Sequence, residues 1–374
     1  MRIAFYAPMK SPRHPVPSGD RRVARLLMGA LRRAGHTVTL ASQLRSWEGA
    51  GDATRQRAIA RRGAARARDL VAGWRGGAGP VPDLWFTYHL YHKAPDWLGP
   101  AVTAALDIPY VVAEASHAPR RAEGPWADGF RSAEAALRHA DALIALTGRD
   151  AAGLTAALGP AAPLHRLPPF LDERPFATVD RAAARRRWGT AEGGPWLLAV
   201  GMMRPGDKAA SFRLLAEALA RLAGRDWRLL IVGYGPLGDT IPGWFPADRL
   251  STVGRVASAD LPSLYGAADI LVWPAVNEAF GMAILEAQAA GLPVVAGREG
   301  GVADIVAEGE TALLARPGDA ADFAAQLARL LDDPALAARM GAAASQHVHE
   351  SHGMEAATLR LDRILAAAVE RHAR

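Results

Sequence analysis

The sequence predicts an α/β protein of two successive domains, each a doubly wound parallel sheet with helices on both faces. Short apolar segments alternate with stretches of helical periodicity along almost the whole chain. This alternation lapses once, near the middle, and then starts afresh. The length of 374 residues suits two domains of ordinary size.

The first alternating series predicts a domain over residues 1–170. Segment 2–7 is short and apolar, as a first strand would be, and Ser18 then caps a helix that ends near Gly35. Continuous apolar strands between helices are typical of a parallel sheet covered on both faces. The further elements expected here are strands at 36–42, 83–88, 109–115 and 140–146, and a basic helix over 54–75.

The second series follows a predicted linker at 171–195 and gives a domain over 196–350. A last helix, 351–374, can pack back on the first domain. Ligands of open α/β sheets bind at the carboxyl ends of the strands, so we expect a site in a cleft between the domains. The strands predicted in this half are 196–201, 227–233, 251–256, 270–276, 292–297 and 311–318.

Composition excludes several classes of protein. The chain has no cysteine, which excludes disulfides, thiolate metal sites and a cysteine nucleophile. No apolar run approaches the roughly 18 residues of a membrane-spanning helix. The opening MRIAFYAP has the pattern of a strand and not of a signal peptide. We therefore expect a cytoplasmic protein.

Positive charge gathers at the start of the chain. The net charge is +6, but residues 1–75 hold 16 basic and 4 acidic residues, a net of +12, which leaves −6 for the rest. Such asymmetry favours an anionic partner. Nucleic acid is disfavoured, because few aromatic residues interleave this region. The helix over 54–75 either lies on an anionic membrane, at its inner face, or packs as an ordinary surface helix; its basic side holds Arg57, Arg61, Arg68 and Arg75.

The most informative stretch, 274–306, joins a strand to a helix that begins near Gly281. The first amides of this helix, those of Phe280, Gly281 and Met282, suit a phosphate group. Glu278 and Glu286 flank them, eight residues apart. That spacing spans about 12 Å of helix, more than the roughly 5–9.5 Å of a glycosidase pair. The two carboxylates either bind two ends of one long ligand or belong to an ordinary amphipathic helix, although AILEAQAAG is almost uncharged.

This stretch resembles a known family. EAFGMAILE, followed by AxxxGLPVVAxxxGGVxDIVxxGxTxLL, is similar to the donor-binding signature of the large, family-four group of retaining glycosyltransferases. That group includes bacterial mannosyl- and glucosyltransferases and sucrose-phosphate synthases. The resemblance implies the GT-B fold, two Rossmann-like domains facing across a cleft. It also implies transfer of a hexosyl group from a UDP- or GDP-sugar to a hydroxyl of a glycan, a lipid-linked acceptor or a small molecule.

The resemblance assigns roles in the second domain. Glu278 would hold hydroxyls of the transferred sugar, Glu286 the ribose diol, and the amides of 280–282 the sugar and diphosphate. Arg204 and Lys208 match the family's basic pair on the diphosphate, although Met202 and Met203 separate the arginine from the preceding glycine. Close approach to the donor is expected at Gly201, Gly233 and Gly235, with Arg255 and Val256 beside the base.

No metal and no cofactor are expected. Cationic side chains and a helix N-terminus can stabilise a leaving diphosphate in place of a metal, and the sequence contains no Asp-x-Asp. GYGPLG at 233–238 fits the spacing of a dinucleotide fingerprint, but Pro242 breaks the helix that should follow.

The acceptor site is expected in the first domain. Gly19 matches a glycine-rich loop that faces the cleft in the family and would contact the donor, while Ser18 beside it also reads as a simple helix cap. His117 follows the predicted strand 109–115 and matches a histidine near the reacting sugar, although a lone histidine is usually structural. Side chains that follow strand 83–88 are expected to line the acceptor pocket, namely Tyr88 and His92 with His89 and Tyr91.

Two other functions share these features. A nucleotide-sugar epimerase of the GT-B fold would consume the donor without an acceptor. A non-catalytic nucleotide-sugar-binding protein would keep Lys208 and Glu286 and bind the donor without turnover. Release of nucleoside diphosphate with and without an acceptor separates both from a transferase.

Overall fold

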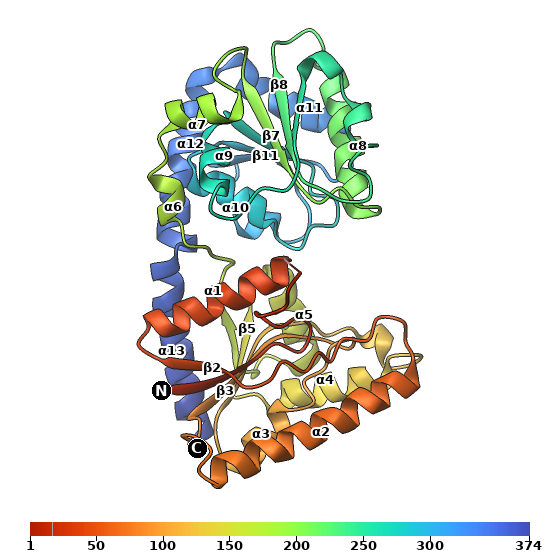
Figure 1. Ribbon diagram of the computed structural model, residues 1–374, viewed down its shortest axis with the longest axis vertical. Helices are drawn as coiled ribbons and strands as arrows, with labels where there is room; N and C mark the ends of the chain where they lie inside the picture. Colours follow the sequence, from red (N-terminus) through yellow and green to blue (C-terminus); the bar gives the residue numbers. More distant parts are fainter. Residues whose placement is uncertain (17) are drawn as a thin grey trace. The chain divides into compact units, whose positions relative to one another are not determined.

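The computed structural model describes residues 1–16 and 18–374. The chain divides into two compact units, which are described separately (Figure 1). The first unit comprises Met1–Pro168 and Ala357–Arg374, and the second comprises Pro169–Ala356.

The first unit is built on a six-stranded sheet of order β2-β1-β3-β4-β5-β6, and every neighbouring pair is parallel. The strand order reverses between β1 and β3, so their carboxyl ends form the position where such sheets bind ligands. The strands are β1 (Arg2–Tyr6), β2 (Thr37–Leu40), β3 (Leu84–Leu90), β4 (Tyr110–Ala115), β5 (Ala142–Ala145) and β6 (Leu164–Arg166). The helices are α1 (Gly19–Arg33), α2 (Ala53–Arg75), α3 (Gly99–Leu106), η1 (Pro119–Arg121), α4 (Ala127–His139), α5 (Gly148–Leu158) and most of α13 (Met354–His372).

The apolar strands form the core of this sheet. Phe5 of β1 stacks on Phe86 of β3 with ring centroids 5.5 Å apart, and both rings are fully buried. Ser18 caps α1 by accepting a hydrogen bond from the Arg21 backbone N–H at 3.2 Å. The capping interpretation of Ser18 is therefore confirmed.

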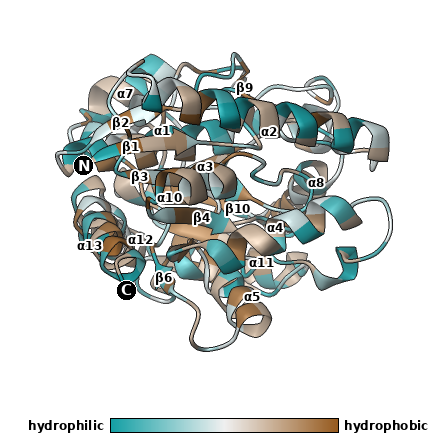
Figure 2. Cartoon of the chain, turned by 90° about the horizontal axis from the view of Figure 1, so that it is seen from below, coloured by the Kyte–Doolittle hydropathy of each residue, from teal (hydrophilic) through white to brown (hydrophobic). Residues whose placement is uncertain are grey.

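The apolar face of helix α2 packs against the rest of the first unit. Gln56, Gly63, Ala67 and Val71 are buried, and a Cβ at Gly63 would lie 2.4 Å from the Trp97 Cβ. Hydrophilic and hydrophobic residues alternate along this helix (Figure 2). The packed surface helix is thus the arrangement observed, and the basic residues predicted to share one side remain exposed, namely Arg57, Arg61, Arg68 and Arg75.

The second unit contains a six-stranded parallel sheet of order β12-β11-β10-β7-β8-β9, which reverses between β7 and β10. Its strands are β7 (Trp196–Val200), β8 (Arg228–Val232), β9 (Leu250–Val253), β10 (Ile270–Trp273), β11 (Val294–Gly297) and β12 (Ala312–Ala315). Its helices are α6 (Arg174–Ala177), α7 (Arg181–Trp188), α8 (Asp207–Ala220), η2 (Pro242–Trp244), η3 (Ala247–Arg249), α9 (Leu261–Gly266), α10 (Met282–Ala289), η4 (Val302–Asp304), α11 (Ala320–Asp332), α12 (Pro334–His347) and η5 (Val348–His352).

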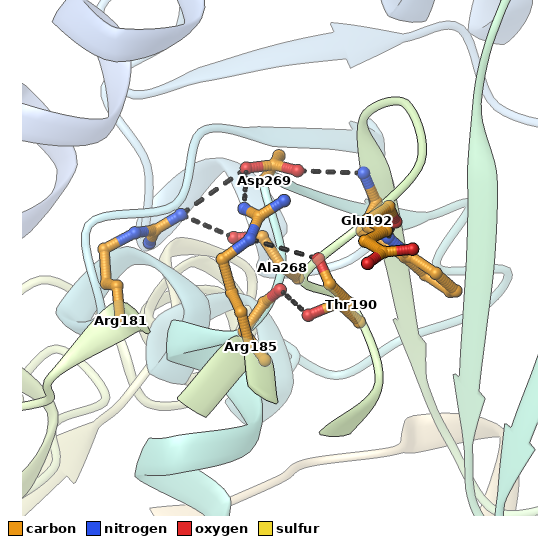
Figure 3. A network of polar contacts seen from close by, with 8 residues as sticks. Arg181, Arg185, Thr190, Glu192, Ala268 and Asp269 are labelled. Atoms are coloured by element: carbon orange, nitrogen blue, oxygen red, sulfur yellow. Dashed lines mark hydrogen bonds and ion pairs between the residues drawn. The ribbon is translucent and has the colours of Figure 1, made fainter. Parts of the chain in front are cut away.

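The predicted linker, 171–195, is a folded part of the second unit. Asp269 binds two of its arginines: Oδ1 accepts from Arg185 Nη1 at 2.8 Å and lies 3.5 Å from Arg181 Nη2. Its Oδ2 accepts from the backbone N–H of Trp196, the first residue of β7, at 2.9 Å. Arg181 donates to the Ala268 carbonyl at 2.8 Å (Figure 3). Ion pairs and hydrogen bonds to the start of β10 therefore hold this segment in place, which the Pro- and Arg-rich sequence did not indicate.

Asp269→Asn is expected to lower the free energy of unfolding by about 1–3 kcal/mol, because an amide cannot replace a carboxylate that accepts from an arginine and a backbone N–H. Urea unfolding measures the change. Asp260→Asn is the matched control, since Asp260 pairs with Arg187 at 2.7 Å on the surface and should change stability by less than about 1 kcal/mol. Equal effects of the two substitutions would contradict the structural role of Asp269.

The end of the chain is fixed to the first unit. Asp362 Oδ1 lies 3.3 Å from His36 Nε2, and His372 Nδ1 lies 3.2 Å from Asp141 Oδ2. Helix α13 thus starts in the second unit, and from Ala357 onward it belongs to the first.

Candidate active site

The loops that follow β7 and β10 meet at the carboxyl edge of the second sheet. These strands are neighbours at the point where the strand order reverses, which is where open α/β sheets bind ligands. Lys208 enters from the first turn of α8, and Glu278 from the loop between β10 and α10.

Lys208 and Glu278 form an ion pair against an indole ring. Lys208 Nζ contacts Glu278 Oε2 and lies 5.1 Å from the centroid of the Trp273 ring. Trp273 Nε1 donates to the same carboxylate oxygen at 3.2 Å. About a fifth of each charged side chain is exposed, 22% for Lys208 and 18% for Glu278. The pair is therefore well positioned and still accessible to a ligand.

The start of α10 offers unpaired amides beside this pair. Gly281, the N-cap, has φ 83°, a conformation that favours glycine. Gly301 N–H donates to the Ala279 carbonyl at 2.7 Å and holds the preceding loop. In the described part of the chain, no carbonyl accepts from the N–H groups of Phe280 or Met282. Such amides at a helix N-terminus can bind an anion.

Glu286 lies deeper than the sequence suggested. Its side chain is buried, at 3% exposed, and its Oε2 accepts from the Tyr265 hydroxyl at 2.6 Å. The alternative of a solvent-exposed glutamate on an amphipathic helix is therefore wrong. Its contact with a ribose stays a prediction.

The three glycines expected to approach the donor have a structural reason of their own. A Cβ at Gly233 would lie 1.8 Å from the Gly201 carbonyl oxygen, and one at Gly235 would lie 2.2 Å from that of Met203. A Cβ at Gly201 would lie 2.7 Å from the Trp273 ring. Glycine here allows neighbouring loops to pack together, which brings the loops after β7, β8 and β10 close to one another.

The remaining cations on this edge are open to solvent. Arg204 is exposed, and no ion pair to it occurs within residues 1–16 and 18–374. Arg255 lies over the Tyr234 ring, 5.6 Å from its centroid, and Val256 beside it is half-buried. After Gly238 the chain forms turns and the short η2, so the helix of a dinucleotide site is absent from this segment, as predicted.

The first unit gathers ionisable groups at the carboxyl edge of its own sheet. His89 Nδ1 lies 3.1 Å from Asp20 Oδ1, at the start of α1, and 3.8 Å from Glu114 Oε1, at the end of β4. His89 and Glu114 both have positive φ, 61° and 54°. Such strained backbone is typical of functional sites.

The charges in this cluster support one another. Burial alone would lower the pKa of His89, but Glu114 and Asp20 raise it overall. Burial would raise the pKa of Asp20, but the hydrogen bond and charge of His89 lower it overall. The pKa of Glu114 is raised by burial, against the charge of His89. The Asp20–His89 pair is thus held in its charged form.

The residues predicted to line one acceptor pocket lie in different surroundings. Tyr88 is buried at 1% exposed, and burial raises its pKa well above the ordinary value. His92 instead packs edge-on against Trp126, with ring centroids 6.1 Å apart. The ring of His117 packs at a tilt against Phe130 of α4, with centroids 5.1 Å apart, and its Nε2 lies 3.6 Å from Glu134. Gly19 is exposed, with open space where a Cβ would stand.

Sequence reasoning missed Asp20 and Glu114. Each carried a signal, since Asp20 follows the helix cap and Glu114 is the single charge in the apolar strand PYVVAEA.

Within the described residues, no group of three or more His, Asp or Glu side chains is placed to hold a metal ion. Nor is any described helix both long and apolar enough to cross a membrane.

Two solved structures superpose on nearly the whole chain. Sucrose-phosphate synthase from Thermosynechococcus elongatus superposes with a TM-score of 0.74, at 22% identity and 98% coverage of each chain. The Anabaena protein HepE, in complex with UDP, superposes with a TM-score of 0.75, at 18% identity, covering 98% of this chain and all of that one. The two units, each built on a parallel sheet, therefore define a GT-B fold.

Sequence comparison adds the family. Residues 194–333 match the family described as Glycosyl transferases group 1, so the chain carries a domain of that family. A D-inositol 3-phosphate glycosyltransferase of Nocardia farcinica is 36% identical over 226 residues, 56% of this chain and 49% of the relative. A 2-deoxystreptamine glucosyltransferase of Streptomyces kanamyceticus is 34% identical over 210 residues, 54% of each. The chain thus spans about half the length of these curated relatives.

Proposed function

We propose that this chain is a retaining, metal-independent glycosyltransferase. It moves a hexosyl group from a UDP- or GDP-sugar to an acceptor hydroxyl. The observation that carries the proposal is the Lys208–Glu278 pair beside the open amides of α10, at the point where the second sheet reverses its strand order. The family of residues 194–333 and the UDP in the HepE structure support it.

The chemistry of the site follows from charge. A departing nucleoside diphosphate gains negative charge, which preorganised cations and amides stabilise. Lys208, Arg204 and the N–H groups of 280–282 are the donors proposed for this task. Glu278 would then accept hydroxyl groups of the sugar, so that donor binding exchanges the Lys208–Glu278 contact for contacts to the ligand. This arrangement supplies the function that a metal ion performs in other transferases.

The acceptor, which is a glycan, a lipid-linked sugar or a small molecule, is proposed to bind the first unit. His89 and its carboxylate partners lie at the edge where that sheet reverses. The exposed arginines of α2 are proposed to support association with the anionic inner face of a membrane. A cytoplasmic location is part of the same proposal.

Release of nucleoside diphosphate from UDP- and GDP-sugars, with and without sugar acceptors, tests this function. We expect acceptor-dependent release that persists in excess EDTA, with the anomeric configuration of the donor retained in the product. Donor consumption without an acceptor would point to an epimerase or hydrolase, and binding without turnover to a sensor. Loss of activity in EDTA, restored by Mg²⁺ or Mn²⁺, would contradict the metal-independent site.

A further inference from the structure

Two cationic side chains lie over one tryptophan in the loops that follow β3 and β4, and a third lies near the adjacent His92. Lys93 Nζ lies 4.5 Å from the centroid of the Trp126 ring, and Arg121 Cζ lies 5.1 Å from it. Arg120 lies near enough to His92, the residue before Lys93, for its charge to lower the pKa of that ring. We call Lys93, Arg120 and Arg121 the basic loop cluster.

The backbone around this cluster is held in place from outside the two loops. The Trp126 indole N–H donates to the Glu48 carbonyl at 3.2 Å, and Glu48 N–H donates to the Lys93 carbonyl at 2.8 Å. Gln56 of α2 donates to the Pro125 carbonyl at 2.7 Å. The ring that the cations share is therefore fixed before any ligand binds, which lowers the entropy lost on binding.

The positive charge of the cluster lacks a partner. In the described part of the chain, no carboxylate forms an ion pair with Lys93, Arg120 or Arg121. The Glu48 carboxylate, whose backbone contacts the cluster, accepts instead from the N–H groups of the turn at 50–52. Like charges held together without a counter-ion repel one another, and an anionic ligand would relieve that repulsion.

His92 lies in the electrostatic field of the basic loop cluster. Burial first, and then the charges of Arg121, Lys93 and Arg120, lower its pKa to about 4. Its ring is thus neutral at physiological pH. Neither ring nitrogen has a hydrogen-bond partner among the described residues, so a neutral imidazole with one donor and one acceptor stands unused beside three cations.

We propose that the basic loop cluster binds a phosphoryl group. Arginine and lysine form strong charge-assisted hydrogen bonds to phosphate, and both loops leave the carboxyl edge of the sheet, where α/β domains bind ligands. The phosphoryl group belongs either to a free sugar or polyol phosphate or to a phospholipid headgroup. In both cases it would identify the acceptor of the proposed transferase as a phosphorylated molecule, and this part of the inference rests on the proposed function.

The test compares two triple variants of the full chain. Lys93→Gln, Arg120→Gln and Arg121→Gln together remove the cluster. Arg33→Gln, Arg363→Gln and Arg371→Gln remove the same charge from exposed positions of the same unit that lie outside α2. In the first arm, inorganic phosphate is titrated and its binding is followed by NMR shifts of the His92 ring. In the second arm, binding to vesicles of phosphatidylcholine and phosphatidylglycerol is measured. The phosphate titration is repeated on the Lys208→Ala variant, so that phosphate bound at the candidate site of the second unit is recognised and excluded.

We expect the cluster variant to bind one of these probes at least about ten-fold more weakly than the wild type, with the control variant unchanged. Loss in the phosphate arm identifies a free phosphate, and loss in the vesicle arm identifies a lipid headgroup. A wild type that binds neither probe, or equal weakening in both variants, would overturn the proposal. UDP affinity, measured on both variants, stays unchanged if only the cluster is affected, so a failure of the donor site is recognised separately.

Discussion

Lys208→Ala is expected to lower kcat/KM for sugar transfer by about 100- to 1,000-fold, the loss typical of removing one preorganised donor to a developing anion. The substitution removes the ammonium that contacts Glu278 and lies over Trp273. It also leaves Glu278 without its cation, so the carboxylate would repel the donor diphosphate. Release of nucleoside diphosphate under single-turnover conditions measures the effect, and calorimetry with UDP measures the part that arises from binding.

Arg213→Ala is the matched control. Arg213 lies on the same helix as Lys208 and also lies over a tryptophan, 4.4 Å from the centroid of the Trp244 ring, but it is exposed and its partner ring belongs to η2. Its removal should leave kcat/KM within about two-fold, as expected for a surface position. A Lys208→Ala enzyme as active as the Arg213→Ala enzyme would refute the role given to Lys208.

Glu286 is a poorer probe of the same site. Because its carboxylate is buried and bonded to Tyr265, removing it would disturb the fold as well as any contact with a ribose. The sequence located Glu286 in an uncharged helix, but it could not show that Tyr265, 21 residues earlier, would supply a partner.

The two sheets were predictable because parallel strands buried on both faces have continuous apolar sequences. Strand β6 was not, since Leu164–Arg166 is only three residues long and contains two polar residues. An Arg- and Ala-rich helix was expected within the predicted linker, but the sequence did not indicate that this segment belongs to the second unit. Segment 174–188 is rich in arginine and mostly exposed, and its Arg185 is bonded to Asp269, 84 residues later.

The loops of the second unit could be found from the sequence because their motif lies directly after strands. The cluster around His89 could not. Side chains alternate between the two faces of a strand, and this rule fails at His89 and Glu114, where φ is positive. Only the folded backbone shows that these two residues meet Asp20 from the start of α1.

His89→Gln is expected to lower the free energy of unfolding by roughly 2–3 kcal/mol near pH 5.5. Removing one member of a largely buried ion pair leaves its partner's charge uncompensated, and about a fifth to a quarter of the His89 and Asp20 side chains is exposed. In the variant Asp20 would face Glu114 without a cation, with Asp150 adding to the negative field. Part of the loss would be recovered by protonation of Glu114, whose pKa burial already raises.

The sign of the pH dependence follows from the two shifts. The pKa of His89 is raised above 6.5, so its contribution is present below pH 6.5 and is lost as the pH rises through the raised value. The pKa of Asp20 is lowered below 3.8, so its contribution is present above pH 3.8 and is lost as the pH falls through the lowered value. The difference between wild type and His89→Gln should therefore be largest between about pH 4 and 6.5 and should shrink towards pH 9.

His165→Gln provides the comparison, because burial without an acidic partner lowers the pKa of His165. A buried histidine that must gain a proton destabilises the fold in acid, so this substitution should make the protein relatively more stable as the pH falls. Urea unfolding of the three proteins from pH 4 to pH 9 measures both trends. If the stability lost in His89→Gln were the same at every pH, the histidine would be packing in its neutral form, and the ion pair with Asp20 would not be what holds the start of α1 against the ends of β3 and β4.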